Sequence, residues 1–390
     1  MSEFTFAERL TKLPPYLFAH LDTLKKAVLA KGKDIIDLGV GDPDLPTPHH
    51  IVSRLATAAQ DSKHHRYPSY AGLLSFREAV SQWYEARFEV RLDPAKEVLS
   101  LIGSKEGIGH IPLAFINPGE MALVPDPGYP VYHNSIILAE GVPYTLPLLK
   151  GNGFLPDFKA IDPGILDQCK LMFLNYPNNP TAAVATGEFL QTAVNLAQNH
   201  HFIICHDAAY SELAFDGFRP PSILQIDGAR DVAIEFHSLS KTYNMTGWRI
   251  GFAVGNSRII EGLGRVKTNL DSGIFEAVQM AGIAALTGPQ SEVHRMVSIY
   301  QERRDLLCDG LMELGFRLEK PKATFYVWIE VPHGYNSTSF CQFLLEKCGI
   351  VTTPGVGFGP HGEGYFRIAL TVDLDRIHTA LERLQTKPWE

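Results

Sequence analysis

The middle of the chain alternates short apolar runs with segments of helical periodicity. The runs are apolar along most of their length, which is typical of strands buried on both faces of a sheet. Helical periodicity separates them, for example over Glu188–Asn199. The predicted strands are Val98–Gly103, Met121–Val124, Leu171–Asn175, Phe202–Cys205, Val232–Phe236 and Arg249–Val254. This alternation predicts an α/β protein with a mainly parallel sheet.

The pattern changes after about Gly288. A long amphipathic helix is predicted over Ser291–Leu314, and the segments beyond it predict a smaller α+β domain. Those segments are the strands Phe325–Val331 and Tyr365–Leu370 and the helices Ser337–Lys347 and Leu374–Leu384. A predicted N-terminal helix, Ala19–Lys31, has an apolar surface that needs a partner. We therefore expect an N-terminal segment (1–45) that joins the small domain (288–390), with the large domain (46–287) between them.

Composition and charge narrow the possible classes of protein. The 390 residues are 45% apolar and 20% charged, with a formal net charge of −8. The chain exceeds the roughly 250–300 residues at which a single core stops growing, and its composition excludes a disordered, collagen-like or coiled-coil protein. Because it has no basic run, it is a poor candidate for binding nucleic acid or an anionic membrane surface.

The chain shows no signal for export or membrane insertion. Its N-terminus mixes acids and bases without an apolar stretch, unlike a signal peptide. No apolar run approaches the ~18–20 residues that span a bilayer. Its five cysteines are an odd number, widely spaced and without a CxxC motif. We expect a cytoplasmic protein whose thiols are reduced and structural.

Polar residues follow several predicted strands, at the edge where ligands bind in an open parallel sheet. Ser104 and Lys105 open a helix after the first strand, a pattern that fits either an anion site or an ordinary helix N-cap. Asp207 follows Phe202–Cys205, with Tyr210 three residues later. A carboxylate at a buried strand end is costly unless it is paired or hydrogen-bonded. These residues therefore predict a polar site at one edge of the sheet.

The loop after the predicted strand Val232–Phe236 contains the largest group of residues that could bind a ligand or react. Ser238 and Ser240 precede Lys241, and Arg249 follows eight residues after the lysine. Two hydroxyls and a guanidinium can hold a phosphate dianion by charge-assisted hydrogen bonds. The lysine is either a solvated loop residue or a Schiff-base lysine whose amine is activated by burial and neighbouring cations. Its position favours the second interpretation and a pyridoxal 5'-phosphate site.

Six motifs in order strengthen this hypothesis: GSKEG, PDPGYPVY, NYPNNPT, HDAAY, SLSKTYNMTGWRIG and YFRIAL. Together they resemble the fold-type I aminotransferases that depend on pyridoxal 5'-phosphate, over residues 35–370. The resemblance implies a large domain with a mostly parallel seven-stranded sheet and a small α+β domain. It also implies amino acid and oxo acid substrates, and a homodimer with active sites at the interface.

The resemblance implies a role for each motif residue. Lys241 matches the Schiff-base lysine that also moves the proton, and Asp207 matches the carboxylate that keeps the pyridine nitrogen protonated. Arg367 matches the arginine that clamps the substrate carboxylate. The cofactor-binding residues implied are Ser104, Lys105, Tyr129, Asn179, Asp207, Tyr210, Ser238, Ser240 and Arg249, with Tyr67 from the neighbouring subunit; Gly41 is implied to lie against the substrate. Three of these residues have an alternative interpretation: Asp207 as a helix N-cap, Tyr129 as a core residue and Arg367 as a surface residue.

One motif departs from the family pattern. Where the family has NNPTG, this chain has Ala182 after Thr181. Alanine can replace glycine without strain only where φ is negative. We therefore expect a local change of the turn with a negative φ at Ala182, and no loss of Asn179.

Several motifs resemble the LL-diaminopimelate aminotransferases in particular, among them LPPYLF, LGVGDPDLPTP and CHDAAYSELAFDG. That resemblance implies transamination between LL-2,6-diaminopimelate and 2-oxoglutarate, giving tetrahydrodipicolinate and glutamate in lysine biosynthesis. Tyr16 and Lys105 are the candidates for the far end of the substrate, and Tyr16 is otherwise an apolar lid residue. The alternatives are a broad aspartate- or alanine-type aminotransferase, a β-lyase that cleaves carbon–sulfur bonds, or a non-catalytic regulator.

Other classes of site find no support. There is no GxxxxGK[ST] motif for a P-loop, and the glycine run Gly355–Gly359 lies where a dinucleotide fingerprint has no use. The histidine pairs His49–His50 and His64–His65 lack an HExxH or CxxC context. We expect both pairs at the surface and no metal site.

Overall fold

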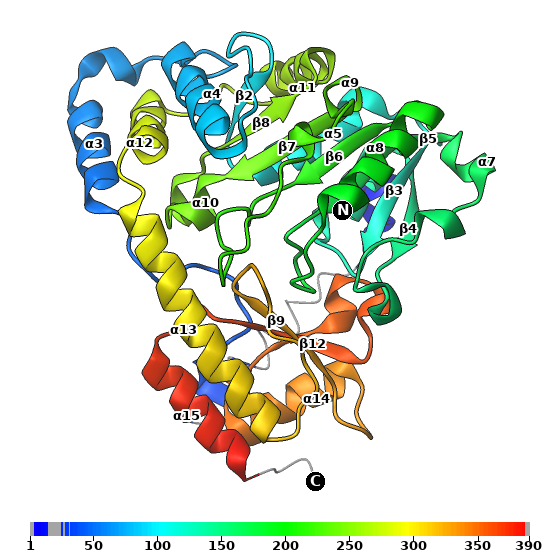
Figure 1. The fold of residues 1–390 in the computed structure, drawn as a ribbon, viewed down its shortest axis with the longest axis vertical. Helices are drawn as coiled ribbons and strands as arrows, with labels where there is room; N and C mark the ends of the chain where they lie inside the picture. Colours follow the sequence, from blue (N-terminus) through cyan, green and yellow to red (C-terminus); the bar gives the residue numbers. More distant parts are fainter. Residues whose placement is uncertain (1–3, 15–24, 26–27, 31, 387–390) are drawn as a thin grey trace.

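A seven-stranded sheet forms the centre of the larger part of the molecule (Figure 1). The computed structural model describes residues 4–14, 25, 28–30 and 32–386. The strand order is β2-β8-β7-β6-β5-β3-β4, and β8 alone runs antiparallel to its neighbours. The strands are β2 (Val98–Leu101), β3 (Met121–Asp126), β4 (Val142–Pro147), β5 (Cys169–Asn175), β6 (Ile203–Asp207), β7 (Ala233–Ser238) and β8 (Gly251–Gly255). The predicted α/β class with a mostly parallel sheet is confirmed.

Helices cover both faces of this sheet because its central strands are apolar on both sides. In β5, Leu171 and Phe173 belong to the cluster formed with α5, α6 and α11, whereas Met172 and Leu174 face the opposite cluster. The helices of the large part are α3 (His49–Gln60), α4 (Leu74–Phe88), α5 (Ser104–Phe115), α6 (Val131–Leu138), α7 (Pro163–Leu166), α8 (Gly187–His200), α9 (Ala229–Val232), α10 (Leu239–Thr242), α11 (Ser257–Leu270) and α12 (Glu276–Thr287).

A smaller layer contains a three-stranded antiparallel sheet in the order β11-β12-β9 (Figure 1). Its strands are β9 (Tyr326–Glu330), β11 (Thr353–Pro354) and β12 (Tyr365–Ala369), and its helices are α13 (Ser291–Glu313), α14 (Ser337–Phe343) and α15 (Leu374–Gln385). The helix predicted over Ser337–Lys347 changes at Leu344 into a π-helical turn that ends before Gly349. In Figure 1, α13 runs from the large part down into this layer.

The N-terminal part of the chain reaches the small layer. Strand β1 (Ile36–Asp37) pairs in parallel with β10 (Ile350–Val351), and the Ala369 amide donates to the Leu38 carbonyl at 2.7 Å. A short helix, α1 (Glu8–Thr11), lies earlier in the chain. Most of the predicted helix Ala19–Lys31 lies outside the described residues. The pairing of β1 brings Gly39 and Gly41 to the side of the large sheet where its parallel strands end.

The remaining features concern the thiols and the membrane. All five cysteines are free and buried. Burial raises the pKa of the Cys341 and Cys308 thiols to about 12, so they are poor nucleophiles. Within the ranges described above, none of the helices has both the length and the apolar character that crossing a bilayer requires.

Candidate active site

Six parallel strands end at the same edge of the large sheet, and motif residues follow five of them. Gly103–Ser104 follows β2, Tyr129 lies beyond β3, Asn179 beyond β5, Asp207 ends β6 and Lys241 follows β7. Because β8 runs the other way, Arg249 just before it lies at this edge too. Arg367 comes from β12 of the small layer and hydrogen-bonds to Asn179. The structure therefore gathers residues that lie far apart in the sequence.

Lys241 lies in α10, a single helical turn after β7 whose N-cap is Ser238. Its Nζ donates a hydrogen bond to the Gly41 carbonyl at 2.9 Å and lies 5.5 Å from the centre of the Phe325 ring. Burial lowers the pKa of Lys241, and the neighbouring cations Arg367 and Arg249 lower it further. Tyr326 and Asp42 oppose this decrease. A lysine with a lowered pKa is a better nucleophile and proton acceptor than a solvated one.

Asp207 is buried, with 6% of its surface exposed. Tyr132 Oη donates to its Oδ2 at 2.7 Å, and the Ala209 amide donates to its Oδ1 at 3.2 Å. Burial raises the pKa of Asp207, and these two hydrogen bonds oppose the rise. Within the described residues no lysine or arginine forms an ion pair with Asp207. Because an unpaired buried charge is costly, Asp207 is suited to pair with a cationic group of a ligand.

Tyr132 was not singled out from the sequence, although it ends the motif PDPGYPVY. It lies on α6, one turn after Tyr129, and is completely buried. The rings of the two tyrosines meet edge to face at a centroid distance of 5.7 Å. Tyr129 itself precedes α6, and the Tyr132 amide donates to the Tyr129 carbonyl at 3.1 Å, so this turn brings the two rings together.

Arg367 is held by partners from two other segments. Its Nη1 donates to Asn179 Oδ1 at 2.6 Å and its Nη2 donates to the Gly39 carbonyl at 2.9 Å. Its Nε is buried and makes no hydrogen bond within the described chain. Burial lowers the pKa of Arg367, while Tyr326 and Tyr210 raise it. Among the residues that the structure describes, no carboxylate pairs with the buried Arg367 cation, which fits a group that awaits an anionic ligand.

Asn175 connects the loop that carries Asn179 to the next strand. Its side-chain amide donates to the Asp207 carbonyl at 2.8 Å, and its Oδ1 accepts from the Asn179 amide at 2.8 Å. Asn175 is buried and was treated only as a strand end in the sequence. It fixes Asn179 relative to Asp207, so both reach the site with little freedom.

Gly103, Ser104, Ser240 and Arg249 form a cradle at the start of α5. Arg249 Nη1 lies 3.5 Å from Ser240 Oγ and donates to the Thr246 carbonyl at 2.8 Å. A Cβ atom at Gly103, where φ is +76°, would lie 2.3 Å from Arg249 Nη2. The guanidinium therefore lies directly against the backbone at the N-terminus of a helix, where free amides favour an anion.

The other predicted site residues lie in different settings. Lys105 is exposed, Tyr129 is half-buried, and Tyr67 is 89% exposed on the loop before α4. Gly41 accepts the Lys241 hydrogen bond through its carbonyl. Tyr16 lies outside the described residues. The described part of the chain records no hydrogen bond or ring contact between Tyr67 and the residues around Lys241, and its predicted contact with a second subunit stays a prediction.

Ala182 contradicts the negative φ expected from the sequence. Its φ is +60°, and its amide donates to the Asn178 carbonyl at 3.0 Å. The turn that the family forms with glycine is therefore formed with alanine in the left-handed region. Such a conformation costs a non-glycine residue about 1–2 kcal/mol. The reason is tertiary, because Asn178 and Thr181 are themselves buried and hydrogen-bonded at 2.8 Å.

His64 also contradicts the sequence, which placed it at the surface. Only 7% of its surface is exposed, and its Nδ1 lies 2.8 Å from Glu276 Oε2. Elsewhere, Glu106, His110 and Asp271 bring possible metal-ligand atoms within 4.8 Å of one another. The Lys267 ammonium already lies 2.9 Å from Asp271 Oδ1 and 3.2 Å from Glu106 Oε2. This cation compensates the two carboxylates, and the expectation of no metal stays a prediction.

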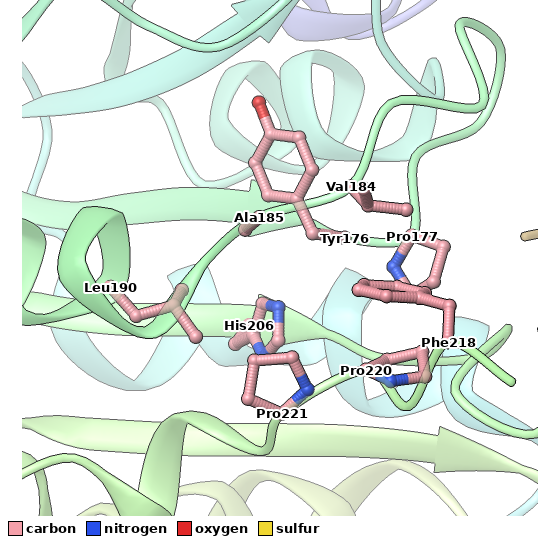
Figure 2. Close-up of a pocket in the computed structure, with 9 residues that line it drawn as sticks. All are labelled: Tyr176, Pro177, Val184, Ala185, Leu190, His206, Phe218, Pro220 and Pro221. Carbon is pink, nitrogen blue, oxygen red and sulfur yellow. The ribbon is translucent and has the colours of Figure 1, made fainter. Parts of the chain in front are cut away.

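A small hollow lies beside the loop that carries Asn179, between that loop and the segment from Phe218 to Pro221. Figure 2 shows His206 near its centre, with Pro177 and Phe218 to one side and Leu190 to the other. It leaves essentially no room for a water-sized molecule, whereas small-molecule pockets measure roughly 300–1,000 Å³. His206 Nε2 is buried there without a hydrogen-bond partner among the described residues. Most of the residues that line the hollow are apolar, and Lys241, Asp207 and Arg367 are not among them.

Comparison with known proteins identifies aminotransferases as the relatives of this chain, in agreement with the residues found at the site. A model of the family "Aminotransferase class I and II" matches residues 33–384. The LL-diaminopimelate aminotransferase of Syntrophobacter fumaroxidans is 57% identical over 382 residues, covering 98% of each chain. That of Desulforudis audaxviator is 55% identical over 382 residues, covering 98% of this chain and 97% of the relative. The substrate-bound structure of BacF from Bacillus subtilis superposes with a TM-score of 0.95 at 39% identity, covering 99% of this chain and 98% of BacF.

Proposed function

The chain belongs to the class I and II aminotransferases, and from that premise we propose that it transfers an amino group from LL-2,6-diaminopimelate to 2-oxoglutarate. The products are tetrahydrodipicolinate and glutamate. Full-length relatives with identities of 55% and 57% are LL-diaminopimelate aminotransferases, which supports the substrate. The observation that carries the chemistry is the assembly of Lys241, Asp207 and Arg367 at one edge of the sheet.

The residues at this edge fit pyridoxal 5'-phosphate as the cofactor. The Gly103–Arg249 cradle suits a phosphate, and Asp207 is a buried carboxylate that lacks a cationic partner among the described residues. When bound, the cofactor supplies an aldehyde that bonds to amines and a protonated ring that accepts an electron pair. Asp207 would hold the proton on the ring nitrogen. Tyr210 and Asn179 would hydrogen-bond the ring oxygen, and Tyr129 would lie on the ring face.

Lys241 would carry the cofactor and then move the proton. Its lowered pKa leaves a larger fraction of the amine unprotonated, so Nζ can accept the proton from the substrate α-carbon. The Gly41 carbonyl, at 2.9 Å, orients Nζ through a hydrogen bond. Arg367 would bind the α-carboxylate with its two terminal nitrogens and so fix the α-carbon near the lysine. Lys105 and Tyr16 are the candidates for the far end of the substrate.

We also propose a homodimer and the division of the chain into residues 1–45, 46–287 and 288–390. The loop before α4, which carries Tyr67, approaches the loop after α11 where Gly273 meets Pro68 and Ser69. Exposed aromatic and aliphatic side chains lie in these loops or at the helix ends that flank them; they are Tyr70, Leu74, Leu270 and Phe275. A second copy would cover them and receive Tyr67 at its phosphate cradle.

Hybrid dimers test this arrangement. Neither Tyr67→Ala nor Lys241→Ala alone should be fully active. In a random mixture of the two, half of the dimers are hybrids and each hybrid has one intact site. Activity should recover to about a quarter of the wild-type value if Tyr67 acts in the neighbouring subunit. A mixture no more active than its components would contradict that role.

The function itself is tested by spectroscopy and by a panel of amino donors. The purified protein should show a visible band of bound cofactor that bleaches when LL-2,6-diaminopimelate is added and returns with 2-oxoglutarate. Lys241→Ala should lose the band and lower turnover by about 10²–10⁴-fold or more. Activity with aspartate or alanine but none with LL-2,6-diaminopimelate would overturn the substrate in favour of a broad aminotransferase. Ammonia release without an oxo acid would indicate a β-lyase.

A further inference from the structure

The Tyr326 hydroxyl lies among the predicted reactive groups although no motif singled it out. Tyr326 is on β9 and only 3% of its surface is exposed. Its Oη lies 3.2 Å from Tyr210 Oη. A Cβ atom at Gly41, whose carbonyl accepts from Lys241, would lie 2.0 Å from Tyr326 Oη. One hydroxyl from the small layer thus adjoins both Tyr210 and the segment that orients Lys241.

The Tyr326 ring has a separate contact. The central carbon of the Arg367 guanidinium lies 4.0 Å from the ring centroid of Tyr326 and 4.7 Å from that of Phe358. An arginine over aromatic rings gains cation–π attraction and loses rotational freedom. Arg367 is therefore restrained by the two rings as well as by Asn179 and the Gly39 carbonyl. Its two terminal nitrogens keep one orientation for a carboxylate.

The number of hydroxyl protons determines which tyrosine donates in the Tyr326–Tyr210 hydrogen bond. Each hydroxyl has one proton to donate. If Tyr210 donated to Tyr326, it would have none left for the oxygen of a bound cofactor ring. Tyr210 can serve that oxygen only if Tyr326 is the donor between them, and a hydroxyl that accepts one hydrogen bond is a stronger donor of the next.

We propose that Tyr326 is a positioning residue of the aminotransferase site, whose hydroxyl donates to Tyr210 and directs the Tyr210 proton to the cofactor oxygen, and whose ring holds Arg367 in orientation for the substrate carboxylate. The inference rests on the proposed function. The proposal also explains why residue 41 is a glycine, because any side chain at this position would displace the Tyr326 hydroxyl from Tyr210.

Two substitutions separate the two contacts. Tyr326→Phe keeps the ring and removes the hydroxyl, so the apparent pKa of the visible cofactor band should rise by about 0.5 or more in a pH titration of the holoenzyme. The Kd of 2-oxoglutarate, measured from its effect on that band, should stay within about twofold of wild type. Tyr326→Leu removes the ring too and should weaken 2-oxoglutarate binding by about tenfold or more.

Tyr300→Phe is the matched control. Like Tyr326, Tyr300 is buried and its ring contacts Phe325; the ring centroids lie 4.9 Å apart for Tyr326 and 5.6 Å apart for Tyr300. The Tyr300 hydroxyl, however, donates to Asp44 Oδ1 at 3.4 Å. The control substitution should change neither the band nor the Kd. A Tyr326→Phe band that titrates like wild type would overturn the role of the hydroxyl, even if the leucine variant did not fold. A wild-type holoenzyme without a visible band would instead contradict the proposed function.

Discussion

Glu235 is a buried carboxylate on β7 that the chemistry of the site does not use. It is fully buried and accepts five hydrogen bonds. The donors are Tyr84 Oη (2.5 Å), Ser222 Oγ (3.1 Å), the Ile223 amide (2.8 Å), His206 Nδ1 (2.8 Å) and His237 Nε2 (2.7 Å). His206 is paired with Glu235 across β6 and β7 and is followed by Asp207. The cluster therefore fixes the ends of two strands that carry site residues.

Glu235→Gln should strongly destabilise the fold. Glutamine keeps the shape but loses the charge, and its amide nitrogen would face donors where an oxygen now accepts. Hydrogen bonds to a charged group contribute about 1.5–3 kcal/mol each, and breaking a buried charged network by removing one member costs about 3–5 kcal/mol. Because five donors converge on Glu235, we expect a loss at the upper part of that range, about 4–5 kcal/mol at pH 7.

Urea unfolding at fixed protein concentration measures this loss. Glu276→Gln is the control, since Glu276 also meets a histidine, His64, but is partly exposed, and it should cost about 1 kcal/mol or less. Burial raises the pKa of Glu235, but hydrogen bonds from His206 and His237 outweigh it and bring the pKa well below its usual range. Its contribution is present above the unfolded pKa of about 4.3 and is lost as the pH falls further. A variant within about 1 kcal/mol of wild type at pH 7 would refute the reasoning.

Two glycine–alanine exchanges give further predictions. Ala182→Gly relieves a φ of +60° and should raise the free energy of unfolding by about 0.5–1 kcal/mol in urea unfolding; a loss of stability would show that the turn is unstrained. Gly103→Ala places a Cβ atom 2.3 Å from Arg249 Nη2 and should raise the Kd of pyridoxal 5'-phosphate by about tenfold or more, measured by absorbance titration. Gly109→Ala, within α5, places a Cβ atom in open space, and this variant should bind the cofactor like wild type.

The sequence predicted the sheet and most of the residues at its edge for one physical reason. Strands buried on both faces are continuous apolar runs, so a polar residue where such a run stops, as at Asp207, is visible without a structure. Strand β4 lacks this signal, because its ends and centre are largely exposed and it contains two prolines. It lies at the edge of the sheet, where burial does not shape the sequence.

The residues that were missed act across elements. Tyr132 reaches Asp207 from α6, and Tyr326 reaches Tyr210 from the other layer. Tyr326 lies within an apolar run and Tyr132 follows Val131 at the start of α6, so each has the pattern of an ordinary core aromatic residue. What distinguishes them is the hydroxyl partner, which depends on how the layers pack. Glu235 shows the converse, since an acid inside an apolar strand is a visible anomaly. The sequence does not show the five donors, which come from β6, β7, α4 and the segment at Ser222. Their hydrogen bonds to Glu235 hold β6 and β7 in place next to the site.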